Sequence, residues 1–278
     1  MARADAGMNA IVLAGGPADD VAALHPGAAN KAFVPVAGIA LVERVVSALR
    51  AVPRVEQIVV VAPSQTHGCA ALAQADETRT DGSRIIDSLR SGMAGFPADE
   101  PLLIVASDLP MLTTPALDEV LDALALRELD VAYTCLARRY HDERFPQIPH
   151  TWARMREGQF CGGGVSAIRP RALGRLSEFL DALGAARKAP LRLAAVFGWD
   201  VVLRFALGRL SIADAQARAT AIMRGPVGAI CCTHPEIAVN VDRPRDVPLA
   251  EALLETQRAG IPATAARPDS SSEAEANP

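Results

Sequence analysis

The chain has 278 residues, which is long enough for one large α/β domain or for two small ones. Half of the residues are hydrophobic, the formal net charge is −4, and Tyr and Trp number only two each, so the composition supports a full core and gives no indication of a nucleic-acid surface. The five cysteines are odd in number and show no CxxC spacing, which argues against both a zinc site and a disulfide framework.

No run of about twenty apolar residues occurs, and the N-terminal stretch MARADAGMNA lacks the long apolar segment of a signal peptide. We therefore expect a cytoplasmic protein with no membrane partner and no nucleic-acid partner. From Ala263 onward the sequence has no apolar periodicity, so we expect one domain over residues 1–262 and a disordered tail over residues 263–278. The sequence does not indicate an oligomeric state.

The first predicted element is a short buried strand that ends at a pair of glycines. Residues 11–13 (IVL) form an apolar run, and Gly15 and Gly16 follow. A glycine pair lets main-chain N–H groups approach a phosphate or a base edge without interference from side chains. The loop then runs to Lys31, which with Lys188 makes up the lysines among 28 basic residues. Lysine and arginine are not equivalent as phosphate ligands, so a lysine at this position of an arginine-rich chain indicates a phosphate ligand. The alternative is a plain strand-to-loop turn followed by a solvated lysine.

The next predicted elements alternate between helix and strand. Residues 39–50 place apolar side chains at helical spacing, and residues 57–62 (QIVVVA) are typical of a strand. The order strand, loop, helix, strand is a βαβ unit and predicts a parallel sheet. Residues 66–74 are predicted to form a short surface helix, and residues 80–84 (TDGSR) a turn.

A second amphipathic helix is predicted over residues 85–94, and a strongly apolar central strand over residues 102–106 (LLIVA). Asp108 follows this strand almost at once. In an open α/β sheet the carboxyl ends of the strands border the ligand crevice, so Asp108 is expected at the same edge as Gly15 and Gly16. The alternative is an ordinary turn or N-cap aspartate.

The middle of the chain departs from this alternation. A helix is predicted over residues 115–127 and a strand over residues 130–135. Residues 138–149 are charged, aromatic and proline-bearing, and they are expected to form a loop or an excursion over the crevice. The sequence thus predicts that the chain leaves the sheet here.

Residues 151–155 and 165–168 are expected to pair as strands around Glu157 and Gly158 and a turn-like stretch over residues 160–164, which contains Gly162, Gly163 and Gly164. Three consecutive glycines indicate a close approach of the backbone to another group. A mobile hairpin tip is the alternative interpretation of the same residues. A ligand contact and a simple turn therefore both stay open for this segment.

The C-terminal part is predicted to be helical before the sheet is completed. Residues 170–223 are almost wholly helical in pattern, and Ser211 is expected to be the N-cap of one of the helices. Residues 227–232 and 238–241 are expected to form a last strand pair, and residues 246–260 a closing helix.

Five short motifs occur in order, several of them at predicted strand ends. They are LAGG at residues 13–16, NK at 30–31, VPVAG at 34–38, SDLP at 107–110 and NVDRP at 240–244. Together they resemble the successive motifs of the MobA-like NTP transferases, within the GT-A type nucleotidyltransferase superfamily. The resemblance runs over about residues 9–260 and implies an α/β fold: three αβα layers, a mainly parallel Rossmann-like sheet, and an α-helical insertion in the C-terminal half.

The resemblance also implies a reaction, in which an acceptor, usually a phosphate monoester, attacks the α-phosphorus of an NTP and releases pyrophosphate, with Mg²⁺ or Mn²⁺ as cofactor. In such a displacement the protein mainly positions the reactants and offsets charge on phosphate oxygens. Mg²⁺ prefers one or two carboxylates and keeps the rest of its shell for water and phosphate. Two strand-end aspartates and one lysine supply that minimum.

Carried over residue by residue, the resemblance implies that Lys31, Asp108 and Asp242 are catalytic and that the two aspartates are the metal ligands. The implied nucleotide-binding residues are Leu13, Ala14, Gly15, Gly16, Lys31, Gly82, Ser88 and Asp108. The implied acceptor-binding residues are Gly162, Gly163, Gly164, Arg187 and Lys188. The acceptor-binding residues belong to an acceptor-side excursion over about residues 138–223.

Some positions depart from the pattern of these relatives. Asp20 stands where many of them carry an arginine that grips the triphosphate, Asp19 adjoins it, and Gly164 stands where an asparagine is usual. Acidic side chains beside a phosphate site weaken binding unless they point away or help to hold a metal. One alternative is therefore a non-catalytic nucleotide-binding protein of the same fold. Another is a sugar-nucleotide-dependent glycosyltransferase, which reuses this fold and its metal-binding carboxylates.

Three other enzyme classes lack their motifs here. A dinucleotide-dependent oxidoreductase would need GxGxxG in the first loop and an acidic residue after the second strand, which instead ends at Pro63. A P-loop kinase needs Ser or Thr after its lysine, whereas Ala32 follows Lys31, and a serine hydrolase needs GxSxG, which is absent. The sequence does not indicate which NTP or which acceptor is used.

Overall fold

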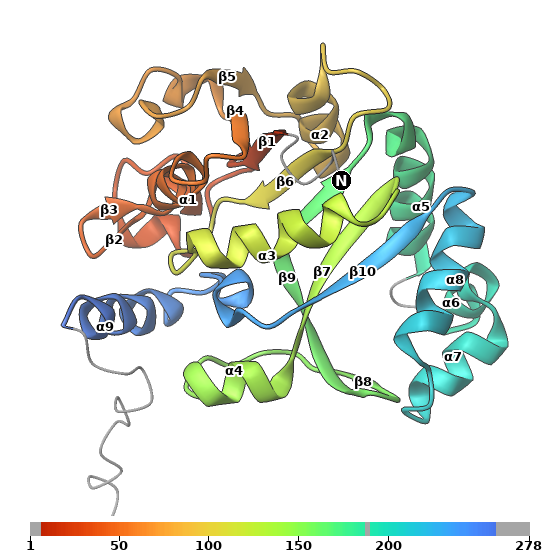
Figure 1. Ribbon diagram of the computed structural model, residues 1–278. Coiled ribbons are helices and arrows are strands. Elements are labelled where there is room, and N and C mark those ends of the chain that lie inside the picture. Colours follow the sequence, from red (N-terminus) through yellow and green to blue (C-terminus); the bar gives the residue numbers. More distant parts are fainter. Residues whose placement is uncertain (1–6, 187–189, 260–278) are drawn as a thin grey trace, which may run out of the picture.

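The structure of the chain is a computed structural model that describes residues 7–186 and 190–259 (Figure 1). One sheet of eight strands runs through this part of the chain in the spatial order β10-β7-β9-β6-β1-β4-β5, with β8 paired to β9. Its strands are β1 (Met8–Leu13), β4 (Val55–Ala62), β5 (Glu77–Thr80), β6 (Leu102–Ala106), β7 (Val131–Ala137), β8 (Ala153–Met155), β9 (Gly158–Ile168) and β10 (Val227–Cys232). A separate hairpin joins β2 (Pro35–Val36) to β3 (Ile39–Ala40).

Most neighbouring strands of the sheet are parallel. β1 is parallel to β4 and β6 on its two sides, and the pairs β4–β5 and β7–β10 are parallel as well. β9 is antiparallel to β6, β7 and β8. The inner strands are near-continuous apolar runs, such as the fully buried Val59, Val60 and Val61 of β4, because both faces of the sheet are covered. The predicted α/β fold with a mainly parallel sheet is confirmed.

Helices cover the two faces of this sheet (Figure 1). The α-helices of the described residues are α1 (Leu41–Arg50), α2 (Ile85–Met93), α3 (Thr114–Ala125), α4 (Arg138–Arg144), α5 (Leu173–Ala186), α6 (Pro190–Phe197), α7 (Trp199–Ala206), α8 (Ile212–Met223) and α9 (Asp246–Arg258). Successive residues of a strand point to opposite faces. Val12 of β1 accordingly shares a core cluster with side chains of α1 and α3, and Ile11 shares another with side chains of α2 and α5. The result is the expected αβα layering.

The helical insertion of the C-terminal half is also confirmed. Helices α5 to α8 lie between β9 and β10 in the sequence, and Figure 1 shows them grouped at one side of the sheet near β10. Ser211 is the N-cap of α8, because its Oγ accepts a hydrogen bond from the N–H of Asp214 at 3.0 Å. The hydroxyl satisfies one of the free N–H groups of the first turn.

The predicted surface helix over residues 66–74 is wrong. The segment instead forms two single-turn 3-10 helices, Ser64–Thr66 and Ala70–Leu72, with Gly68 between them at a φ of +79°. A residue in the left-handed region interrupts a right-handed helix. The polar edge strand β5 then follows, which the sequence analysis did not predict, and it pairs in parallel with β4.

The stretch predicted as a loop over residues 138–149 begins with a helix. α4 continues directly from β7, and Arg138 Nε lies 2.8 Å from Asp142 Oδ2 one turn away. Such a pair supports a short helix that has little apolar periodicity. The loop proper starts at Phe145, whose side chain is fully buried.

The three consecutive glycines lie inside strand β9 and do not form the predicted turn. The hairpin between β8 and β9 turns earlier, since Met155 pairs with Gly158. A Cβ atom at Gly163 would lie 2.3 Å from Thr134 Oγ1, and β9 shifts its register against β7 nearby. The close approach that the glycines indicate is therefore an approach of strand to strand.

The predicted last strand pair is half right. Residues 227–232 form β10, but β10 pairs with β7, and residues 238–241 form no strand. The 3-10 helix Pro235–Ala238 precedes them, and the N–H of Val241 donates to the carbonyl of Asp108 at 3.0 Å. This single backbone bond ties the segment to the end of β6 in place of a strand ladder.

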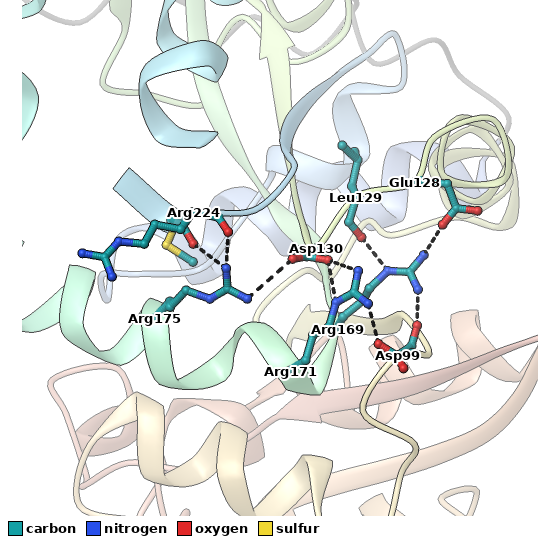
Figure 2. A network of polar contacts seen from close by, with 9 residues as sticks. Asp99, Glu128, Leu129, Asp130, Arg169, Arg171, Arg175 and Arg224 are labelled. Atoms are coloured by element: carbon teal, nitrogen blue, oxygen red, sulfur yellow. Dashed lines mark hydrogen bonds and ion pairs between the residues drawn. The ribbon is translucent and has the colours of Figure 1, made fainter. Parts of the chain in front are cut away.

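A network of arginines holds the sheet at the amino end of β7 (Figure 2). The buried carboxylate of Asp130 accepts hydrogen bonds from Arg171 Nε at 2.9 Å and Nη2 at 2.6 Å, and it lies 4.0 Å from Arg175 Nη2. Arg169, at the end of β9, donates to the carbonyl of Leu129 at 2.9 Å. The network joins β7, β9 and α5 at the amino end of β7, whereas Asp108 lies beyond the carboxyl end of β6.

Some predictions fall on residues that the structure does not describe. These are the disordered tail over residues 263–278, the domain end at residue 262, and the acceptor-binding residues Arg187 and Lys188. Within the ranges 7–186 and 190–259, no helix has the length and apolar character that spanning a membrane requires.

Candidate active site

The loop after β1 opens the candidate site at the carboxyl edge of the sheet. Ala14 N–H still donates to the carbonyl of Val61 at 2.8 Å. Gly16 then has a φ of +108°, a conformation that residues with a side chain rarely adopt. A Cβ atom at Gly15 would lie 2.5 Å from the Cβ of Asp81. The backbone path and a close neighbour therefore require glycine at both positions of the loop.

Asn30 ties this loop to the segment that follows it. Its Nδ2 donates to the carbonyls of Ala14 at 2.9 Å and Gly16 at 3.1 Å. Its Oδ1 accepts from the N–H of Ala32 at 3.0 Å. The residue is 2% exposed, so water competes little for these hydrogen bonds. Asn30 thus fixes its neighbour Lys31 beside the glycine loop.

Replacing Asn30 with alanine is expected to lower the free energy of unfolding by about 1–3 kcal/mol, because buried polar groups lose their partner. The glycine loop also loses its anchor, so the affinity for nucleotide is expected to fall. Urea unfolding followed by circular dichroism measures the first effect, and calorimetric titration with NTP measures the second. An unchanged unfolding curve together with an unchanged affinity would contradict this role.

Lys31, Asp108 and Asp242 meet at one point although they are far apart in the sequence. Lys31 Nζ lies 2.6 Å from Asp108 Oδ2 and 2.7 Å from Asp242 Oδ1. Asp108 stands just beyond β6, and Asp242 follows Val241, which is bound to the Asp108 carbonyl. The structure therefore brings together the three residues that the sequence analysis selected as catalytic.

The three side chains differ in exposure, from 10% for Asp108 and 28% for Lys31 to 57% for Asp242. Burial raises the pKa of Asp108, and the Lys31 ammonium opposes that rise. Burial acts against the charge of Lys31 too, but Asp108 and Asp242 outweigh it and hold the pKa of Lys31 above its usual range. The Lys31 ammonium therefore contacts two carboxyl groups at once, one buried and one largely exposed.

The backbone that carries Asp242 is held by the first residue of α9. Asp246 Oδ2 accepts from the N–H of Asp242 at 3.1 Å and from the N–H of Arg243 at 2.8 Å. A carboxylate at a helix N-terminus is favourable in its own right. Asn240 Nδ2 contacts the Asp242 carboxylate from the other side. The position of Asp242 is therefore set by neighbours within the same short segment.

Asp81 is a further candidate residue that the sequence analysis did not select. Its Oδ2 accepts from the N–H of Gly16 at 2.8 Å, so its carboxylate lies against the glycine loop. Asp81 follows β5, and it was missed because that strand was missed. The signal in the sequence is the polar run Glu77–Thr80, with threonine in alternate positions, ahead of an Asp-Gly turn.

Gly82 and Ser88 shape the turn that carries Asp81. Gly82 N–H donates to Ser88 Oγ at 3.0 Å, and Ser88 is buried. A Cβ atom at Gly82 would lie 2.3 Å from the Cβ of Asp87. Leu13 closes β1 next to Ala106 of β6. These contacts place the residues near the glycine loop, and their nucleotide-binding role stays a prediction.

Two departures from the pattern of the relatives have a local structural explanation. Asp19 Oδ1 accepts from the N–H of Ala22 at 2.9 Å, so its carboxylate is used within its own turn. A Cβ atom at Gly164 would lie 2.8 Å from Leu109 Cδ1. Leu109 follows Asp108 directly, so a larger residue at position 164 would press on the segment that holds the Asp108 carboxylate.

A cavity of about 400 Å³ opens beside Asp242. Gly162, His150, Arg243 and Arg245 are among its lining residues. Arg243 has no ion-pair partner among the described residues, while Arg245 Nε lies 3.9 Å from Asp246 Oδ1. The cavity wall therefore carries the guanidinium of Arg243, which makes no ion pair within the described residues, together with the carboxyl groups of Asp242 and Asp246.

His150 lines this cavity, and the ring of His141 packs against it, in surroundings that favour the neutral imidazole ring. The ring of His150 lies 4.6 Å from that of His141 and 5.7 Å from that of Trp152. The Nε2 atoms of both histidines are buried without a hydrogen-bond partner in the described part of the chain. Burial lowers the pKa of His150 to about 4, and it lowers the pKa of His141 in the same way.

The free energy of unfolding is expected to decrease as the pH falls from about 6.5 to about 4. A histidine in an unfolded chain has a pKa of about 6.5. In this window the unfolded chain therefore binds a proton at His150 that the folded chain does not bind, so stability rises with pH. Urea unfolding at several pH values in this range measures the slope, and His150→Asn is expected to reduce it. Identical slopes for the two proteins would contradict the assignment.

A glycine loop after the first strand, one lysine and two aspartates at the carboxyl edge of a mainly parallel sheet define an α/β nucleotidyltransferase. The model of the MobA-like NTP transferase domain matches residues 10–187, which is more than half of the chain. The chain belongs to the MobA-like NTP transferase family.

Solved structures with the same architecture include one of substantial sequence similarity. A hypothetical transferase from Thermus thermophilus is 32% identical, with a TM-score of 0.75, over 87% of this chain and 99% of that one. Comparison with curated proteins gave no match.

Two more distant structures share the fold. One is 4-diphosphocytidyl-2C-methyl-D-erythritol synthase from Anaerococcus prevotii, which is 11% identical with a TM-score of 0.57 over 90% of this chain and 99% of that one. The other is CMP:2-keto-3-deoxy-manno-octonic acid synthetase in complex with CTP, which is 15% identical with a TM-score of 0.53 over 90% of this chain and 100% of that one.

Proposed function

We propose that this enzyme transfers a nucleoside monophosphate from an NTP to a small phosphorylated acceptor and releases pyrophosphate, in a reaction that depends on Mg²⁺ or Mn²⁺. The observation that carries the proposal is the meeting of Lys31 Nζ with the carboxylates of Asp108 and Asp242 at 2.6 and 2.7 Å. These groups lie beside the glycine loop, which Asn30 ties to Lys31 through the carbonyls of Ala14 and Gly16. The combination suits a triphosphate with its metal ion.

The two carboxylates fit the needs of Mg²⁺. Asp108 Oδ2 and Asp242 Oδ1 contact the same nitrogen atom, so their separation cannot exceed the sum of the two contacts. One or two neighbouring carboxylates are what Mg²⁺ takes from a protein, and it keeps its other positions for water and phosphate oxygens. In the described part of the chain, no group of three or more His, Cys, Asp and Glu could hold a metal ion. The donor set therefore favours Mg²⁺ or Mn²⁺ with a phosphate ligand over an all-protein metal cage.

The charge of the site supports the requirement for a metal ion. One ammonium group faces two carboxyl groups at this point, so Lys31 alone cannot offset both of them and the charge of a triphosphate. A bound divalent cation supplies the charge that offsets the phosphate oxygens. Lys31 then contributes a compact ammonium group, held by Asn30 next to the loop where the phosphates are expected.

The remaining residues divide between the two substrates. We assign the nucleotide to the loop Leu13, Ala14, Gly15 and Gly16, together with Lys31, Asp108, Gly82 and Ser88, and we add Asp81. We assign the acceptor to the cavity beside Asp242, where Arg243 offers an unpaired guanidinium to a phosphate group. Gly162 lines this cavity. Gly163, Gly164, Arg187 and Lys188 remain candidates from the resemblance, within the acceptor-side segment of residues 138–223.

The proposal is tested by incubating the enzyme with each NTP, Mg²⁺ and a panel of phosphorylated sugars and cofactor precursors. Pyrophosphate release that requires NTP, acceptor and metal together is the expected result, and mass spectrometry should find the nucleotidyl group on the acceptor. Arg243→Ala is expected to raise the KM for the acceptor by about tenfold, because the acceptor loses one charged hydrogen bond. It should leave the KM for NTP unchanged.

Two results would overturn the proposal. Tight binding of NTP without pyrophosphate release for any acceptor would indicate a non-catalytic nucleotide-binding protein. Preferential binding of sugar nucleotides with release of a nucleoside diphosphate would indicate a glycosyltransferase. Addition of sugar nucleotides to the panel distinguishes these outcomes, because a non-catalytic protein releases no nucleotide product and a glycosyltransferase releases a nucleoside diphosphate.

A further inference from the structure

Two cysteines outside the candidate active site lie side by side on strands β7 and β10. Cys135 and Cys231 are direct partners in the parallel register of these strands, and their sulfur atoms are 3.4 Å apart. Neighbouring strands lie about 4.8 Å apart, which is inside the range of about 4.4–6.8 Å between Cα atoms over which a disulfide closes. The backbone of the two strands therefore already has the separation that a disulfide between these residues needs.

The two thiols differ in their access to solvent. Cys231 is exposed, whereas Cys135 is buried. Cys231 also lines a cavity of about 490 Å³, whose wall includes Arg138 and Arg139. A small oxidant can therefore reach the sulfur of Cys231 from solvent. Cys135 is then the second thiol within reach of any species that forms on Cys231.

The contact between the two thiols shifts their pKa values in opposite directions. The hydrogen bond with Cys135 lowers the pKa of Cys231 to about 7, and the charge of Arg127 acts in the same direction. The same hydrogen bond raises the pKa of Cys135, and burial adds to that rise. Because the thiolate is the nucleophile, Cys231 is suited to attack an oxidant and Cys135 to react in the second step.

The neighbouring cysteines lack this combination. Burial raises the pKa of Cys161 to about 11 and that of Cys232 to about 12. Cys232 follows Cys231 in the strand, so its side chain points to the opposite face of the sheet, where it belongs to the hydrophobic core. Residues 7–186 and 190–259 contain no cluster of three or more metal-ligating side chains. The thiol pair is therefore suited to redox chemistry and not to metal binding.

We propose that Cys231 and Cys135 form an oxidation site at which hydrogen peroxide closes a disulfide between β10 and β7. The Cys231 thiolate attacks one peroxide oxygen and breaks the O–O bond, which leaves a sulfenic acid and a hydroxide ion that takes up a proton. The Cys135 sulfur then attacks the Cys231 sulfur and expels hydroxide, which leaves as water with the Cys135 proton. Two thiols lose two electrons, and one peroxide becomes two waters.

The full chain is treated with hydrogen peroxide, its remaining thiols are alkylated in denaturant, and it is digested with trypsin. The expected product is a dithiothreitol-sensitive link between the peptide of residues 128–138, which carries Cys135, and the peptide of residues 225–245, which carries Cys231 and Cys232. Fragmentation of the linked peptides should assign the bond to Cys231. Intact mass spectrometry should show the loss of two hydrogens and of two alkylation sites. This readout does not depend on nucleotide transfer.

Single variants separate the two steps. Cys231→Ser is expected to abolish the link, and Cys135→Ser is expected to stop at a sulfenic acid on Cys231 that dimedone traps. Cys69→Ser is the matched control, because Cys69 is half-buried and contacts no other thiol among the described residues; this variant should form the link as the wild type does. In native wild type, Cys231 should also be alkylated faster than Cys69, because Cys231 is exposed and its contact with Cys135 favours the thiolate.

Several results would overturn the proposal. One is a link that joins Cys231 to another cysteine or to a second chain, and another is irreversible oxidation of Cys231 while Cys135 remains free. The proposal would also be overturned if Cys231 were alkylated no faster than Cys69. If Cys135→Ser does not fold, the peptide link and the alkylation rates of the wild type decide the matter alone.

Discussion

Replacing Asp108 with asparagine is expected to slow pyrophosphate release by at least about a hundredfold. Removal of one preorganised charged or polar group from an active site typically reduces the rate by about this factor. Asparagine has nearly the same size, so the packing beyond β6 is kept while the charge is removed. Mg²⁺ binds carboxylates much better than amides, and Lys31 loses the nearer of its two partners. A coupled pyrophosphate assay at saturating NTP and Mg²⁺ measures the effect.

Asp122→Asn is the matched control for this experiment. Asp122 is an aspartate of α3 with 71% side-chain exposure that pairs with Arg54. Its replacement should leave the rate within about twofold of wild type, since exposed ion pairs contribute little. If Asp108→Asn is folded and as active as this control, the assigned role of Asp108 is wrong.

Replacing Lys31 with methionine is expected to lower kcat by a factor on the order of 10² to 10³. The flexible apolar chain of methionine fills the same space but leaves two carboxylates without their ammonium partner. Lys31→Arg is expected to restore little, because a planar guanidinium cannot occupy the place of a compact ammonium between two oxygens. Steady-state kinetics with NTP as the varied substrate separates the effect on kcat from that on KM.

The distribution of the loss between the two constants is the decisive observation for Lys31. A fall in kcat indicates an interaction that strengthens in the transition state, whereas a rise in KM alone indicates uniform binding of the nucleotide. Arg50→Met, which removes a cation from an ion pair with Asp76 on the surface, controls for a general charge effect. Equal kinetics for the Lys31 and Arg50 variants would remove Lys31 from the mechanism.

The parts of the fold that could be predicted are those with strong periodicity. The strands β1, β4 and β6 are apolar runs because the sheet buries them on both faces, and α1 shows the spacing of one buried stripe. The edge strand β5 is polar, so it carries no such signal. The glycines of β9 were interpreted as a turn because sequence alone cannot separate a turn from a close contact between strands.

The candidate site was predictable where it depends on strand ends. Asp108 and Gly15 each follow an apolar strand, and parallel strands end at one edge, so their proximity follows from the fold. Asp242 could be placed only by resemblance, because a single backbone bond from Val241 brings it to the site. The role of Asn30 as an anchor could not be predicted either, since its three hydrogen bonds link backbone groups that only the folded loop brings together.

Strand β9 has a consequence for the way this chain is made. It inserts between β6 and β7 and pairs with both, yet it is synthesised after each of them. While the ribosome produces the segment from α3 to β8, the outer edge of β6 is exposed on the nascent polypeptide, and such an edge is a template for association with other chains. A fragment that stops after α3 is therefore expected to aggregate, even though it contains the complete glycine loop, Lys31 and Asp108.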